Sequence, residues 1–119
     1  MKSLLVIIEE EYLSKGIAIA LMNEYQSIHT TKNPFEAIEI LERENIDAIV
    51  SDAKFSTISV EKYLNRLEKA SKKATKIIIL HEDPNENYIQ SDKIIFRQKP
   101  ISIINIIEIL KSNSKTKIN

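Results

Sequence analysis

The chain has 119 residues and a mass of 13.7 kDa, which is the size of one domain. Hydrophobic residues make up 43% and charged residues 29% of it, a composition that is typical of globular proteins and excludes disordered and fibrous chains. The formal net charge is zero and there is no Cys, so we expect no nucleic-acid partner, no disulfide framework, no thiolate metal site and no Cys nucleophile. The apolar runs are too short for a signal peptide or a membrane span, which favours a cytoplasmic protein without a membrane partner.

Charge is unevenly spread along the chain. Residues 1–60 carry five Lys or Arg and ten Asp or Glu, whereas residues 61–119 carry twelve and seven. One interpretation is chance combined with a lysine-rich end. The other interpretation is an acidic site built from the first half of the chain.

The first segments alternate between strand and helix patterns. Residues 2–8 contain five consecutive apolar residues, which is typical of a strand covered on both faces in a parallel sheet. Residues 11–25 carry apolar side chains at helical spacing and predict an amphipathic helix, with Glu11 either as its cap or as a surface residue. Residues 26–30 are a short candidate strand.

A strong helix start follows this candidate strand. Asn33 is a good N-cap and Pro34 suits the first helical position. Glu36 lies where a capping box places its acidic residue. We therefore predict a helix from Pro34 to about residue 45, followed by a strand over residues 46–51.

The next segments repeat the alternation. Residues 59–73 predict a helix with apolar residues on one face and many Lys on the other. Residues 76–80 predict a buried strand. The pair Asp83 and Pro84 repeats the pattern of a cap followed by proline, so we predict a short helix over residues 84–90.

The last part of the chain predicts one more strand and one more helix. Residues 93–97 have a strand pattern, and Ser102 is a good N-cap for a helix that ends near Lys111. The apolar stripe of this helix is wider than one packing face requires, so it serves either the core alone or also a contact with a second copy or another protein. We assign residues 1–112 to one domain and residues 113–119 to a polar C-terminal tail.

Five strands and five helices in strict alternation predict an α/β fold. Right-handed crossovers then place helices on both faces of one parallel sheet. In such sheets a ligand binds beyond the carboxyl ends of the strands, at the point where the strand order switches. The order 2-1-3-4-5 would bring the first and third strands side by side at that point.

Charged and polar residues follow four of the predicted strands. Glu9 and Glu10 follow the first strand, Asp52 ends the third, His81 follows the fourth and Lys99 follows the fifth. Clustered carboxylates repel one another unless they share a cation, and a hard divalent ion such as Mg²⁺ relieves that repulsion. The pattern suggests an aspartyl-phosphate site, with Asp52 as the nucleophile and with the metal and Lys99 as electrostatic stabilisers.

With these residues in this order, the chain resembles the receiver domain of two-component response regulators over essentially its whole length. Residues 5–10 are similar to the family's hydrophobic strand that ends in an acidic pair, and residues 47–52 to the strand that ends in the phosphoacceptor Asp. Residues 96–100 are similar to its aromatic residue, lysine and proline. The resemblance implies a flavodoxin-like, doubly wound, five-stranded parallel sheet of order 2-1-3-4-5 and a cis peptide bond before Pro100.

The resemblance also implies a function in phosphorelay signal transduction. Asp52 would accept a phosphoryl group from a histidine kinase or a phosphotransfer protein, and Lys99 would stabilise that group. Glu9, Glu10 and Asp52 would hold Mg²⁺. The phosphoprotein would then relay the signal to a downstream protein partner, so we expect a signalling domain that is not an enzyme.

The chain departs from the family at several of these positions. Glu9 and Glu10 form the acidic pair where the family mostly has Asp, and their longer side chains weaken the octahedral geometry that Mg²⁺ requires. His81 stands at the position of the family's Ser/Thr switch residue. Lys54 follows the phosphoacceptor, and its ammonium could pair with Asp52 in place of the metal. Only a shortened fourth helix fits between the last two strands.

These departures leave three hypotheses. The first is an atypical receiver that is phosphorylated on Asp52. The second is a pseudo-receiver that is not phosphorylated and acts as a constitutive protein-interaction module. The third is a small α/β enzyme or mononucleotide binder, against which the G-x-G-x-x-G and P-loop motifs are missing and the only glycine is Gly16. The chain is either a stand-alone receiver or a piece of a longer regulator, and a homodimer through the last helix fits both receiver hypotheses.

Overall fold

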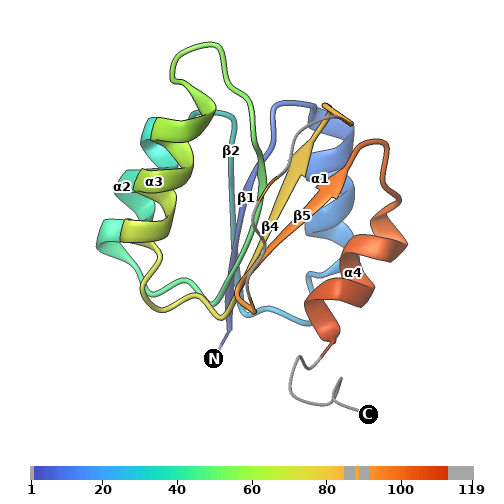
Figure 1. The fold of residues 1–119 in the computed structure, drawn as a ribbon. Helices are drawn as coiled ribbons and strands as arrows, with labels where there is room; N and C mark the ends of the chain where they lie inside the picture. The colour runs from blue at the N-terminus through green and yellow to red at the C-terminus, as the bar shows by residue number, and fades with distance from the viewer. Residues whose placement is uncertain (1, 85–87, 89–91, 113–119) are drawn as a thin grey trace.

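Strands and helices alternate around one parallel sheet in the computed structural model, which describes residues 2–84, 88 and 92–112 (Figure 1). The elements in chain order are β1 (Ser3–Ile7), α1 (Glu11–Ala20), β2 (Ser27–Thr31), α2 (Pro34–Arg43), β3 (Ala48–Asp52), α3 (Val60–Ala70), β4 (Lys76–His81), β5 (Ile94–Gln98) and α4 (Ile103–Lys111). The strand order is β2-β1-β3-β4-β5, and every neighbouring pair is parallel. The predicted flavodoxin-like α/β fold is therefore confirmed.

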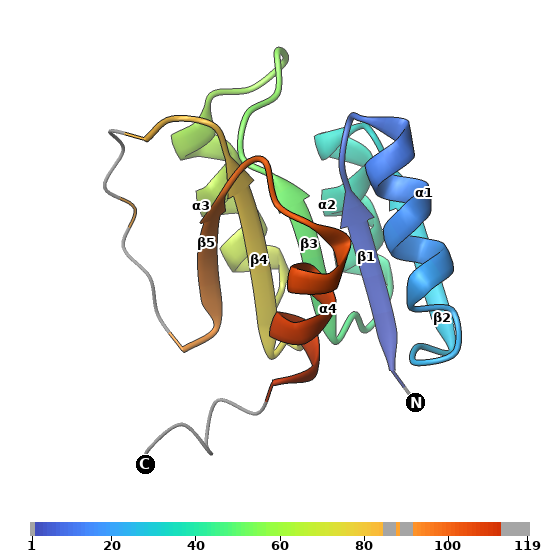
Figure 2. The ribbon, with the colours of Figure 1, turned by 90° about the vertical axis from the view of Figure 1, so that its right-hand side faces the viewer.

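Helices cover the sheet on both faces. Helices α2 and α3 lie on one face, and α1 and α4 lie on the other (Figures 1 and 2). Along β1, Leu5 and Ile7 pack into the core on the side of α2 and α3, while Leu4 and Val6 pack into the opposite core. This alternation follows from the two-residue period of a strand, and it explains why the central strands are continuous apolar runs. Each fully buried Leu or Ile contributes about 2 kcal/mol to folding.

The start of α2 is set by local sequence. Asn33 Oδ1 accepts a hydrogen bond from the Phe35 backbone N–H at 2.8 Å, so the predicted N-cap is confirmed. The capping-box role predicted for Glu36 is wrong in detail. The Asn33 N–H donates to Thr31 Oγ1 at 3.0 Å, and the Thr31 hydroxyl in turn donates to the Glu36 carboxylate. Ser102 caps α4 as predicted.

Helix α1 ends at Ala20, five residues before the predicted end. The Leu21 N–H closes the last turn on the Ile17 carbonyl at 3.1 Å, and the chain then turns so that the Gln26 N–H reaches the Lys2 carbonyl at 2.9 Å. The prediction was wrong here because residues 21–26 must return the chain to the amino end of β1, where β2 begins. Burial of Leu21 in the core anchors this turn.

Two predicted features fall largely outside the described residues. These are the short helix over residues 84–90 and the tail over residues 113–119. Within the described ranges there are four helices, compared with five predicted for the whole chain. None of these four helices has the length and apolar character needed to cross a membrane.

Helices α1 and α4 approach each other closely on their shared face. A Cβ atom at Gly16 would lie 2.5 Å from Ile103 Cδ1, so the only glycine of the chain stands where the two helices meet. The carboxyl end of α4 is fixed by Lys76, whose Nζ donates to the Ile109 carbonyl and to Ser112 Oγ, both at 2.9 Å. A cation at this end of a helix stabilises its free carbonyl groups.

Candidate functional site

The carboxyl ends of β1, β3, β4 and β5 form the rim of an open cleft. Glu9 and Glu10 follow β1, Asp52 ends β3, His81 ends β4 and Lys99 follows β5, and all five residues line this cleft. Parallel strands present their carboxyl ends at one edge of the sheet, which is why residues far apart in sequence meet here. The structure thus brings together the residues that the sequence placed in one site.

Asp52 is the most buried charged residue of the cleft, with 5% of its surface exposed. Lys99 Nζ lies 2.8 Å from Asp52 Oδ1, and this ion pair is the contact given for Oδ1 among the described residues. Asp52 Oδ2 accepts a hydrogen bond from the Glu9 backbone N–H at 2.9 Å. Lys99 is itself held by its backbone N–H, which donates to the His81 carbonyl at 2.7 Å, and the peptide bond to Pro100 is cis.

The two residues of the acidic pair, Glu9 and Glu10, make different contacts. Glu10 is the N-cap of α1, and its carboxylate accepts hydrogen bonds from the backbone N–H groups of Tyr12 at 3.2 Å and Leu13 at 3.1 Å. Glu11 is an exposed residue in the first turn of that helix, so of its two predicted roles the surface role holds and the cap role is wrong. Glu9 is exposed beside Asp52. No three His, Asp or Glu side chains are grouped to hold a metal ion in the part of the chain that the structure describes.

The cation that neutralises Asp52 is Lys99, whereas the sequence left Lys54 as a candidate. Lys54 lines the same cleft but is exposed, and no salt bridge joins it to any described residue. Glu82 Oε2 lies 3.8 Å from Lys99 Nζ, and its side chain is 79% exposed. Solvent screens this second contact, so the buried carboxylate of Asp52 dominates the interaction with Lys99.

A row of rings borders the cleft on the side of β5. The rings of His81 and Tyr88 lie 4.7 Å apart at an angle of 50°, and Tyr88 stacks on Phe96 at 4.6 Å and 10°. His81 Nδ1 is buried and has no hydrogen-bond partner among the described residues. Sequence reasoning missed Tyr88, because no motif or spacing marks it as a neighbour of His81.

A second buried contact lies directly behind Asp52. Tyr63 on α3 and Ser51 on β3 are both fully buried, and their hydroxyl oxygens are 2.6 Å apart. Ser51 Oγ also donates to the Asp52 carbonyl at 2.8 Å. Burial raises the pKa of the Tyr63 hydroxyl well above its usual range, and the Asp52 charge adds to that shift. Tyr63 is therefore a neutral hydroxyl that links α3 to the strand carrying Asp52.

No protein-family model matches the sequence, and no curated protein matches it either. Solved structures do match. The receiver domain of a Francisella response regulator is 25% identical, with a TM-score of 0.71, and the match covers 90% of this chain and 91% of that one. A response regulator receiver protein from Sinorhizobium medicae is 16% identical, with a TM-score of 0.75 over 97% of this chain and 95% of that one.

A third match is a response regulator protein from Burkholderia pseudomallei. It was solved with a phosphorylated aspartic acid, a calcium ion and citrate. It is 20% identical with a TM-score of 0.71, and the match covers 97% of this chain and 69% of that one. The resemblance seen in the sequence is confirmed at the level of the fold, because this chain has the fold of response regulator receiver domains.

Proposed function

We propose that the chain is the receiver of a two-component phosphorelay, which accepts a phosphoryl group on Asp52 and relays the signal through a protein–protein contact. The observation that carries this proposal is the buried Asp52 carboxylate at the switch point of the sheet, 2.8 Å from the Lys99 ammonium. A carboxylate held beside a fixed ammonium suits the capture of a group that carries negative charge. The phosphorylated aspartic acid of the Burkholderia protein, which has the same fold, supports the proposal.

The phosphoryl donor would be a phosphohistidine of a kinase or phosphotransfer protein. One Asp52 oxygen attacks phosphorus, the P–O bond forms and the P–N bond breaks. The electron pair of the broken bond stays on the imidazole of the donor, which then takes up a proton. The Glu9 backbone N–H orients the Asp52 carboxylate, and the Lys99 ammonium balances charge on the phosphoryl oxygens. His81 lies at the same rim, where its imidazole would contact the phosphoryl group in place of a hydroxyl.

The donor atoms of the cleft fit a hard divalent cation such as Mg²⁺. Carboxylate oxygens are the donors that such an ion takes, and Asp52 and the exposed Glu9 both line the cleft, with Lys99 as the cation now paired with Asp52 Oδ1. Glu10 can join them only by giving up its two hydrogen bonds at the start of α1. When bound, the ion supplies positive charge against the oxygens of the transferred group.

An amide NMR titration tests the proposal directly. We expect Mg²⁺ to shift the amides near Glu9 and Asp52, and beryllofluoride, which mimics an aspartyl phosphate, to produce a second set of shifts. Acetyl phosphate should add one phosphoryl group by intact mass. Asp52→Asn should abolish the beryllofluoride shifts and the mass change. Glu39→Gln, which removes one exposed charge on α2, should leave both unchanged.

Two results would overturn this assignment. One is beryllofluoride binding that survives in Asp52→Asn. The other is the absence of any beryllofluoride response in the wild-type chain at millimolar concentrations, which would instead support a pseudo-receiver that binds its partner constitutively.

The contact surface that we propose for a second copy of the chain is α4. Ile104 is 67% exposed on this helix, which is more than a helix packed only on the core requires. Sedimentation of the wild-type chain and of Ile104→Lys tests this surface. A dimer that dissociates in the variant supports it, and a wild-type monomer at high concentration excludes it.

A further inference from the structure

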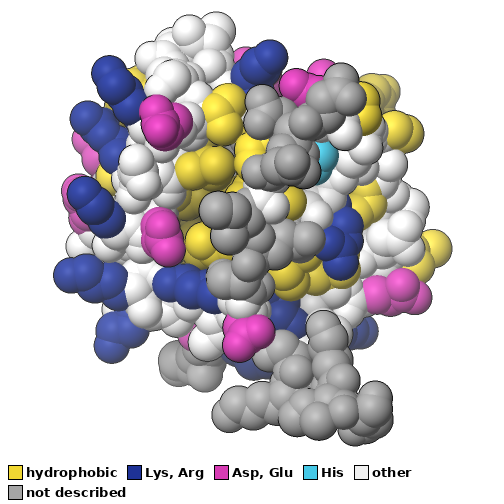
Figure 3. All heavy atoms as spheres, viewed as in Figure 1, with side chains coloured by type: hydrophobic (Ala, Val, Ile, Leu, Met, Phe, Trp, Pro, Cys, Tyr) yellow, Lys and Arg dark blue, Asp and Glu magenta, His cyan; other side chains and the backbone are white. Residues whose placement is uncertain are grey.

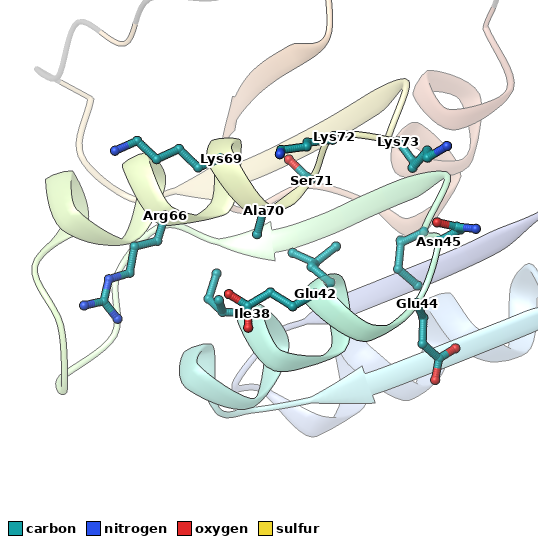
Figure 4. Close-up of a pocket in the computed structure, with 12 residues that line it drawn as sticks. Ile38, Glu42, Glu44, Asn45, Arg66, Lys69, Ala70, Ser71, Lys72 and Lys73 are labelled. Atoms are coloured by element: carbon teal, nitrogen blue, oxygen red, sulfur yellow. The ribbon is translucent and has the colours of Figure 1, made fainter.

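A groove of about 590 Å³ lies between α2 and α3, away from the Asp52 cleft (Figure 4). The segments that close it, residues 44–46 and 71–73, precede β3 and β4, so the groove lies at the amino ends of the strands whereas Asp52 lies at the carboxyl ends. The apolar residues that line it are Ile38, Leu41, Ile46 and Ala70. Its size matches sites that bind small molecules or peptide side chains.

One wall of the groove is basic. Arg66 and Lys69 come from α3, and Lys72 and Lys73 come from the segment that follows it. All four are exposed, and none of them forms a salt bridge with any residue that the structure describes. Lys62 extends the series by one helical turn, since Lys62, Arg66 and Lys69 have the spacing of one helix face. Figure 3 shows several Lys and Arg side chains, with Asp and Glu side chains among them, along the edge of the molecule where α2 and α3 lie in Figure 1.

The opposite wall carries only part of the charge needed to balance these cations. It contributes Glu42 and Glu44. Glu44 is already engaged, because its carboxylate lies 3.1 Å from His29 Nε2 and 3.8 Å from Arg43 Nε. In Figure 4 Glu44 points away from the groove, whereas Glu42 points into it. Four cations and one uncompensated carboxylate therefore line the groove, which has an excess of positive charge. Figure 4 shows Lys69 and Lys73 extending away from Glu42, so their charges lie at the rim of the groove.

We propose that this groove is a docking site for an acidic peptide segment of another protein. An apolar side chain of that segment would occupy the floor, and its carboxylates would pair with Arg66 and Lys69. An apolar centre with a charged rim is the arrangement of protein-recognition surfaces. The groove is a poor nucleic-acid site, because no aromatic side chain lines it for base stacking and the chain has no net positive charge.

This site differs in role from the Asp52 cleft. It lies at the amino ends of the strands and shares no lining residue with the Asp52 cleft. The docking that we propose is therefore constitutive, and it would keep a partner bound whether or not Asp52 carries a phosphoryl group.

Fluorescence anisotropy with a fluorescein-labelled peptide of alternating Glu and Leu tests this site. We expect Arg66→Glu/Lys69→Glu to weaken peptide binding about tenfold or more, because two attractive contacts become repulsive. Lys15→Glu/Lys32→Glu is the matched control, since it makes the same change in net charge at exposed positions outside the groove. We expect its affinity to stay within about twofold of wild type at physiological salt, where charges more than about 8 Å apart are largely screened.

A second variant tests the apolar floor separately from the charges. Ala70→Gln adds a longer side chain to the half-buried floor without changing net charge, and it should also weaken peptide binding. Circular dichroism of each variant shows whether it remains folded.

Three results would overturn the proposal. The first is a wild-type chain that does not bind the peptide at millimolar concentrations. The second is an equal loss of affinity in the groove variant and the control, which would show charge attraction without a site. The third is a labelled single-stranded oligonucleotide that binds more tightly than the peptide and depends on the same two cations, which would assign the surface to nucleic acid.

Discussion

A double-mutant cycle on Ser51 and Tyr63 tests whether the two hydroxyl groups behind Asp52 act as one unit. Their oxygens are 2.6 Å apart in a fully buried environment. Ser51 has one hydroxyl proton and donates it to the Asp52 carbonyl, so the Tyr63 hydroxyl must donate to Ser51 Oγ. The substitutions are Tyr63→Phe, Ser51→Ala and the two combined.

The magnitudes follow from which group each substitution leaves without a partner. Tyr63→Phe keeps the ring and its edge contact with Phe55, at 4.9 Å and 69°, but removes the donor to Ser51. We expect it to lower the free energy of unfolding by about 1.5 kcal/mol. Ser51→Ala leaves the Tyr63 hydroxyl as a buried donor without an acceptor, which costs about 2 kcal/mol. The double variant leaves neither group unpaired, so its cost should be about 1.5 kcal/mol smaller than the sum of the two single costs.

Urea unfolding followed by circular dichroism measures all four proteins. Tyr12→Phe is the matched control, because Tyr12 is 88% exposed and its hydroxyl should contribute less than about 0.5 kcal/mol. If the two single costs add to the double cost within about 0.3 kcal/mol, the hydroxyl groups do not interact in solution and the reasoning is refuted.

Two further predictions concern groups close to Asp52. Lys99→Met should lower the free energy of unfolding by about 2 kcal/mol, because it leaves the buried Asp52 carboxylate without its cation. The double variant Asp52→Asn/Lys99→Met should recover most of that loss, as measured by urea unfolding. Equal stability of the single and double variants would contradict this. Burial raises the pKa of Tyr63, so the folded chain keeps a proton that the unfolded chain releases near pH 10. The resulting stability is complete below about pH 10 and is lost as the pH rises further. Over a series of alkaline pH values, the free energy of unfolding should therefore fall less steeply for Tyr63→Phe than for the wild-type chain.

The sheet order and the main charged pair could be predicted because they depend on short patterns. Continuous apolar runs identify buried parallel strands, and the residues that end those runs meet at one edge of the sheet. Asp52 and Lys99 were found in this way. The caps Asn33 and Ser102 were also predictable, because a cap acts on backbone groups two or three residues away.

Contacts that depend on the rotation of a helix could not be predicted. The sequence places Tyr63 on the inward face of α3, but only the packed helix shows that its hydroxyl reaches Ser51. Tyr88 was missed for a different reason, since no periodic pattern in the sequence predicts the contacts of its ring with His81 and Phe96. Only the structure shows that Lys99, and not Lys54, pairs with Asp52, because both lysines line the same cleft.

Two interactions, metal binding and helix capping, compete for the carboxylate of Glu10. As half of an acidic pair it is a candidate ligand of Mg²⁺, and as the residue before α1 it is a candidate helix cap. The structure assigns its carboxylate to the N–H groups of Tyr12 and Leu13. Such a cap is worth about 1 kcal/mol, so recruiting Glu10 to an ion would weaken binding about fivefold relative to a site with a free carboxylate. If the cleft binds the metal ion proposed above, that binding would be coupled through Glu10 to the first turn of α1.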